Sequence, residues 1–245
     1  MSTSRRHSVL RWALYGKQYE TCECLIHAVQ TQATDQYLSA IVIQETKHVI
    51  FFSKVGFLRP PLRATVAVRL PLEAGAQPNL CHPSGERKGS PLNCATRNAT
   101  DILLLKSPLD FGADVDANGN DGKTGLIHAA RIDNARFAML LLEYGANINS
   151  VSTNGSTPLT TAIIYNSHNV LRLSLDRWHE YSICPRMKGP NLLLIAALYA
   201  DPTTLQILAA TDHFRRKYDK QYILGDFENH LKQRPDFTEK FGIGI

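Results

Sequence analysis

Two nine-residue stretches decide the fold: Gly122–Ala130 (GKTGLIHAA) and Gly155–Ile163 (GSTPLTTAI). They repeat one another at an offset of 33 residues, with glycine, threonine, leucine and alanine at matching places. A further copy begins at Gly189, at an offset of 34, and again carries a leucine and paired alanines where the pattern requires them. A fixed period of this length indicates stacked copies of one small unit, because no single unit can bury its apolar face alone.

The other half of the unit recurs as well. Leu140–Asn149 (LLLEYGANIN) corresponds to Asp110–Asp116 (DFGADVD), and their glycines are 33 residues apart. Leu72–Asn79 (LEAGAQPN) is another such ending, and Ser90–Ala95 (SPLNCA) is another such beginning.

These motifs resemble the ankyrin repeat, whose signature is Gly-x-Thr-Pro-Leu-His-x-Ala-Ala followed by Leu-Leu-x-x-Gly-Ala-Asp/Asn-x-Asn. The clean match runs from Gly112 to about Asp176, and looser matches extend it to Leu72 and to about Ala210. Leu10–Ile26 resembles one further helix pair. The resemblance implies an all-α solenoid of about five helix pairs with projecting turns.

The residue types of the motif have physical roles in such a unit. Thr157 can cap the first helix, and Pro158 suits its first turn, where no backbone donor is needed. Paired alanines, Ala129 and Ala130, let neighbouring helices approach closely. Gly145 is expected to end the second helix in a left-handed conformation.

The sequence departs from the signature at several positions. Gly125 replaces the proline and Ile127 the histidine. Trp178 stands where the closing glycine of a second helix belongs, so we expect a longer loop over 178–188. The spacing of 37 between the closing glycines at 75 and 112 predicts an insertion around Gly85–Gly89.

We therefore divide the chain into four segments. The second segment, residues 29–60, fits no repeat, and strands are expected in it at Ala40–Ile43 and His48–Phe52. Alternatively, that segment is an unstructured insertion or untranslated sequence kept in a gene model; a peptide from Tyr37 to Lys54 detected by mass spectrometry would exclude the last. The segments are a degenerate repeat (1–28), a non-repeat insertion (29–60), the array (61–212) and a cap (213–245).

Two short helices are expected in the cap, at Asp226–Leu231 and Pro235–Phe241. Terminal units of solenoids differ from internal ones because their outer face meets water. The cap also resembles the ending of many fungal ankyrin proteins.

Composition limits the classes of protein that fit. With 44% hydrophobic residues among 245, wholesale disorder is excluded. No run approaches the roughly 18 apolar residues of a membrane helix, and five cysteines suit reduced thiols. We expect an intracellular chain, cytoplasmic or nuclear, with no membrane partner. The net charge is +5, but residues 101–160 hold four Lys/Arg against seven Asp/Glu.

Few residues point to chemistry. Cys22, Cys24 and His27 have ligand-like spacing, but no second cluster completes a metal site. Cys81–His82 pairs a nucleophile with a base without an oxyanion-stabilising element. His128 falls on the face that ankyrin proteins use and is expected to be a packing or contact residue. We expect no metal, no cofactor, no small-molecule substrate and no enzymatic activity, since the non-repeat segments of about 30 residues are too short for an ordinary catalytic domain.

The resemblance implies a scaffold that binds a partner protein on its concave face, built from turn tips and first helices. The alternative is a nucleic-acid-associated or regulatory adaptor that uses basic terminal segments such as Arg215–Lys220. Phosphate-driven binding would weaken steeply with salt, which separates the two hypotheses; we do not expect nucleic acid. The positions carried over as contacts are Asn118, Asn120, Asp121, Lys123, Arg131, Ile132, Val151, Thr153, Asn154, Ser156, Ile164 and Tyr165.

Overall fold

The computed structural model describes the residues 68–69, 72–73, 75–79, 92, 95–96, 102–177, 192–211 and 221–241. Within these ranges the chain forms helices joined by turns and loops, and no strand occurs among them. The chain divides into two compact units, 1–120 and 121–245, and each is described by itself. The prediction of an all-α fold is confirmed for the described part of the chain.

Several predicted features lie outside the described residues. They are the degenerate repeat (1–28), the insertion (29–60) with its expected strands, and the loops at 85–89 and 178–188.

In the first unit, α6 (Ile102–Asp110) buries Leu104, Leu105 and Leu109. The helix is followed by Gly112, whose φ of 79° is left-handed. The side chain of Asn79 joins this turn to the preceding one: its Nδ2 donates to Gly112 O (3.3 Å), and its Oδ1 accepts from the N–H of Asp114 (2.7 Å). A contact between residues 33 and 35 apart shows that equivalent turns lie side by side.

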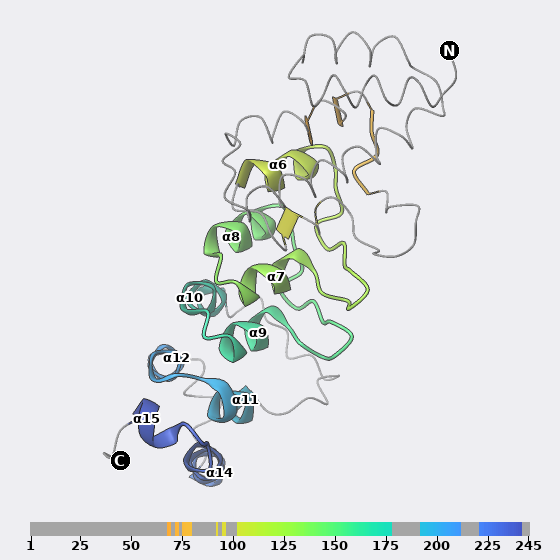
Figure 1. The fold of residues 1–245 in the computed structure, drawn as a ribbon. Helices are drawn as coiled ribbons and strands as arrows, with labels where there is room; N and C mark the ends of the chain where they lie inside the picture. Colours follow the sequence, from red (N-terminus) through yellow and green to blue (C-terminus); the bar gives the residue numbers. More distant parts are fainter. Residues whose placement is uncertain are drawn as a thin grey trace, which may run out of the picture. The chain divides into compact units, whose positions relative to one another are not determined.

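The second unit is a series of helix pairs (Figure 1). Each pair has a first and a second helix, and the first helices α7, α9 and α11 form one row, while α8, α10 and α12 form another beside it. In both rows each helix packs on the next. The pairs are α7 (Gly125–Arg131) with α8 (Ala135–Glu143), α9 (Pro158–Ile164) with α10 (His168–Asp176), and α11 (Leu192–Tyr199) with α12 (Pro202–Ala209).

The helix ends form as the sequence motif predicts. The Thr157 hydroxyl accepts from the N–H of Thr160 (3.2 Å), and the Thr160 hydroxyl accepts from the N–H of Thr157 (2.8 Å), which makes a reciprocal capping box. At the end of α8, Gly145 has a φ of 84°. The N–H of Ala146 then donates to Leu141 O (2.9 Å), the pattern of a Schellman motif.

Small and aliphatic side chains form the core between the two rows of helices. Ala129, Ala162 and Ala196 occupy equivalent positions in α7, α9 and α11, and each is completely buried. Leu141 of α8 and Leu171 of α10 are completely buried in the second row. The alanines that repeat in the sequence are therefore the positions at which first helices meet their neighbours.

The chain ends in two further helices, α14 (Gln221–Lys232) and α15 (Phe237–Phe241), and α14 packs on α11. The two short helices expected near Asp226–Leu231 and Pro235–Phe241 are confirmed. The first of them begins five residues earlier than predicted, and the second begins two residues later.

Candidate functional site

The positions carried over as contacts are all at least partly accessible. Asn118 and Asn120 are exposed residues of the first unit. The other ten lie in the second unit, on the turns before α7 and α9 and at the ends of those helices. Six of these ten are exposed: Arg131, Ile132, Val151, Thr153, Asn154 and Tyr165, with Val151 at 48% and Tyr165 at 55%.

The turn tips of the second unit are tied to one another. Both the N–H and the hydroxyl of Thr153 donate to Asp121 O, at 3.2 and 2.8 Å. Gly122, which follows Asp121, has a φ of 67°. A Cβ at this position would come within 2.8 Å of the Thr153 backbone nitrogen. Glycine is therefore required by both the conformation and the close approach of the two turns.

Polar contacts also fix the individual tips. The Lys123 ammonium lies 3.1 Å from a carboxylate oxygen of Asp121. Partial burial raises the pKa of Asp121, but hydrogen bonds from Lys123 outweigh it and the pKa is lowered. In the next turn, Asn154 Oδ1 accepts from the N–H of Ser156 (3.3 Å). These side chains hold the turns in shape as well as facing solvent, so their loss would disturb the tips themselves.

A row of exposed apolar side chains follows the ends of the first helices. Ile132 caps the end of α7 and Tyr165 the end of α9, and Tyr199 is the last residue of α11. Their exposed fractions are 44%, 55% and 50%. We call these three residues the apolar row. Ile132 and Tyr165 were predicted as contacts; Tyr199 was missed, although it lies 34 residues after Tyr165.

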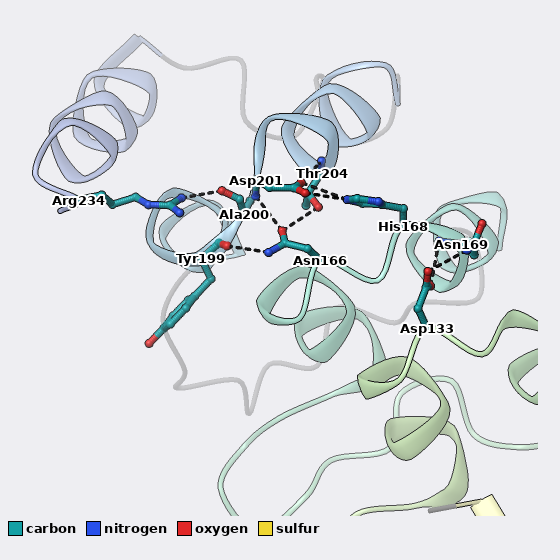
Figure 2. Close-up of polar contacts among 9 residues, drawn as sticks. All are labelled: Asp133, Asn166, His168, Asn169, Tyr199, Ala200, Asp201, Thr204 and Arg234. Atoms are coloured by element: carbon teal, nitrogen blue, oxygen red, sulfur yellow. Dashed lines mark hydrogen bonds and ion pairs between the residues drawn. The ribbon is translucent and has the colours of Figure 1, made fainter. Parts of the chain in front are cut away.

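Beside this row, the helix pairs are joined by side chains of two left-handed residues. Asp133 and Asn166 occupy equivalent positions after α7 and α9, with φ of 52° and 53°. Asp and Asn are the non-glycine residues that adopt this conformation most readily. Each reaches the next helix pair (Figure 2).

Asp133 caps a helix of the following pair. One carboxylate oxygen accepts from the N–H groups of Asn169 and Val170, both at 3.0 Å, and the other accepts from the Asn169 amide at 2.8 Å. Ser167, the residue that precedes α10, makes no capping hydrogen bond with its own side chain. The start of α10 is therefore capped by the preceding pair, where a carboxylate also complements the helix dipole.

Asn166 makes the next connection in the series. Its Oδ1 accepts from the N–H of Asp201 (2.7 Å) and from the Thr204 hydroxyl (3.0 Å), and its Nδ2 donates to Tyr199 O (3.3 Å). His168 Nε2 lies 3.0 Å from a carboxylate oxygen of Asp201 (Figure 2). Both the end of α11 and the start of α12 are thus held by the preceding pair.

Comparison with known families agrees with this geometry. Residues 92–181 match the family model described as ankyrin repeats, three copies. This segment of the chain consists of ankyrin repeats. The family prediction and the predicted helical solenoid are both confirmed.

The ankyrin repeats are shared with proteins of diverse organisms. The chain is 37% identical over 82 residues to the human ankyrin repeat and SOCS box protein 6, which covers 31% of this chain and 20% of that protein. It is 32% identical over 120 residues to a putative ankyrin repeat-containing protein of Treponema pallidum (strain Nichols), covering 48% of this chain and 40% of that protein. It is 38% identical over 69 residues to the rice potassium channel AKT1 (Oryza sativa subsp. japonica), covering 28% and 7%. The chain thus matches only a minor part of each relative.

The structure decides between the two roles expected for His128, packing and partner contact. Its exposed fraction is 2%. It lies in α7, where Leu126 to Ala130 are all buried. His128 is therefore a packing residue of the array and does not belong to an exposed surface.

The other candidates for chemistry lie outside the described residues, namely Cys22, Cys24, His27, Cys81 and His82, as do the basic residues Arg215–Lys220. Within the described ranges, no three His, Cys, Asp or Glu side chains gather as a metal site would require. No helix in these ranges is long and apolar enough to cross a membrane.

The hydrogen bonds that Asp201 accepts from Thr204 and His168 are expected to make the ankyrin array sensitive to acid. Burial raises the pKa of Asp201, but hydrogen bonds from Thr204 and His168 outweigh burial and lower the pKa below its ordinary value of 3.8. A carboxyl group with a lowered pKa stabilises the fold above the unfolded value, and this contribution is lost as the pH falls through the folded value. We therefore expect the array to lose stability below a pH of about 4.

Urea unfolding of the parent chain and of Asp201→Asn at several pH values tests this. The parent should be more stable near neutral pH, and the difference should shrink as the pH falls below about 4. Asp121 and Asp236 are unchanged in both proteins, so the difference reports on Asp201. A difference that stays constant over this range would contradict the assignment.

Proposed function

We propose that this chain is a non-catalytic scaffold that binds a partner protein through the concave surface of its ankyrin array. Ankyrin repeats are generally protein–protein interaction modules. The observation that carries the proposal is the apolar row. Three large apolar side chains, Ile132, Tyr165 and Tyr199, stand about half exposed at equivalent places in consecutive repeats. Aromatic residues and arginine are enriched in the centres of protein interfaces, and exposed Arg131 is next to this row.

The turn tips supply a second group of contacts for the same partner. Val151 and Thr153 are exposed on the turn before α9. Because Thr153 is bonded to Asp121, the tips are held in place before a partner arrives. A preformed surface loses less conformational entropy on binding, which favours affinity.

We also propose a cytoplasmic or nuclear location. An odd number of cysteines, five in all, suits a reducing compartment in which thiols stay unpaired.

Capture experiments with the purified chain test the surface. We expect a partner protein captured from native lysate by the parent chain to be lost by the Arg131→Glu/Tyr165→Glu variant, because charge reversal and a buried carboxylate oppose docking. The matched control is Arg136→Glu/Met139→Glu, which alters two exposed residues of α8, the second helix of a repeat. All three proteins should have the same circular dichroism and melting temperature.

The pattern of capture separates the possibilities. A protein held by the parent and the α8 control, but not by the first variant, supports the concave surface and identifies the partner. Equal capture by all three proteins would contradict a site at Arg131 and Tyr165. Loss in the α8 control alone would move the site to the second helices.

A further inference from the structure

The last two helices, α14 and α15, continue the spacing of the ankyrin array. α10, α12 and α15 begin at residues 168, 202 and 237, which are spacings of 34 and 35. Arg234 lies between α14 and α15, as Asn166 lies between α9 and α10 and as Asp133 lies between α7 and α8. The register therefore puts Arg234 at the position whose side chain joins neighbouring helix pairs elsewhere in the array.

The side chain of Arg234 is buried and makes several hydrogen bonds. Its side chain is only 6% exposed. Its Nη1 donates to Ala200 O at 2.6 Å and to Ala197 O at 3.4 Å (Figure 2 shows the first). Its Nε and Nη2 donate to the two carboxylate oxygens of Asp236, at 2.9 and 3.0 Å. Lys240 lies 2.9 Å from the same carboxylate. A guanidinium with this paired carboxylate is fixed in one orientation.

The direction of this contact is opposite to that of the internal repeats. Asp133 and Asn166 reach forward and accept N–H groups at the start of a later second helix. Arg234 reaches backward and donates to carbonyls at the end of α11. A guanidinium has five donors and no acceptor, so it cannot cap a following helix. A cation at the end of α11 is also favoured by the helix dipole.

We infer that residues 221–241 form the terminal unit of the array and that Arg234 is the latch that fastens it to α11. α14 packs on α11, and Leu231 of α14 is buried. Glu228, Asn229 and Lys232 of α14 are exposed. The unit thus covers α11 through α14, and exposed polar side chains lie elsewhere on α14.

Hydrogen exchange on the full chain tests the latch. Amide protection is measured along all described helices in the parent, in Arg234→Ala and in Lys232→Ala, which removes a nearby exposed cation that lies 3.9 Å from Glu228. We expect Arg234→Ala to lower protection in α14 and at the end of α11 by about tenfold or more, because charged hydrogen bonds are lost. Protection in α7–α10 should be unchanged. Lys232→Ala should match the parent.

A second variant, Arg234→Lys, keeps the charge and loses the forked geometry. An intermediate loss of protection is expected, because an ammonium can make one of these bonds but cannot bridge Asp236 and Ala200 together. The inference is overturned if Arg234→Ala and Lys232→Ala exchange alike. It is also overturned if Arg234→Ala lowers protection equally in α7–α12, since Arg234 would then support the whole array and not its terminal unit.

Discussion

Replacing Leu141 by alanine is expected to lower the free energy of unfolding by about 2–5 kcal/mol. Leu141 is completely buried in α8, a helix that packs on α7 and α10. The substitution leaves a cavity. The free energy of unfolding therefore falls by the lost transfer free energy of the side chain plus a term for the cavity. Urea denaturation with a two-state fit gives the change directly.

The control for this change is Met139→Ala in the same helix. Met139 is 46% exposed, so its truncation should cost much less than that of Leu141. Similar losses for the two variants would show that the cost does not come from the burial of Leu141. An unchanged midpoint for Leu141→Ala would disprove the stacked core at α8.

Replacing Asp133 by alanine is expected to cost about 1–2 kcal/mol. The change removes an acceptor from two backbone N–H groups at the start of α10 and from the Asn169 amide. It also places alanine at a φ of 52°, where alanine is strained. Because Ser167 makes no capping bond, no group within α10 replaces the lost carboxylate.

Asp133→Asn separates the causes. Asparagine tolerates the left-handed conformation and keeps one acceptor oxygen, so it should be more stable than Asp133→Ala and less stable than the parent. Thermal unfolding of the three proteins measures this order. Equal stability of the parent and Asp133→Ala would show that α10 does not depend on the preceding repeat for its cap.

The repeated elements of the fold could be predicted because each is a local consequence of its residues. Thr157 and Pro158 start a helix by their own chemistry, and Gly145 ends one by its left-handed φ. Identical units at a 33-residue period must then stack, so the paired alanines had to be buried. The exposed positions Ile132 and Tyr165 followed from the same register.

The connections between repeats could not be predicted in this way. Asp133 contacts Asn169 and Val170, 36 and 37 residues on, through bonds to backbone N–H groups, so the residue types of its partners give no signal in the sequence. For His128 the sequence left packing and partner contact both open, because a helix of seven residues shows too few positions to fix which side faces the core. Arg234 was not recognised because α14 and α15 carry none of the repeat signature, and only the register of the folded chain reveals its position.

Each of these junctions of the second unit is crossed by hydrogen-bonding side chains, and this has a mechanical consequence. Asn166 joins the α9–α10 pair to the α11–α12 pair, and Arg234 joins α14 and α15 to the end of α11. Since each pair is bonded mainly to its neighbours, tension applied at the C-terminal end would act on one junction at a time. The chain would extend in steps that begin with the contact between Arg234 and Ala200, with the repeats nearer α7 still folded while those nearer α15 open.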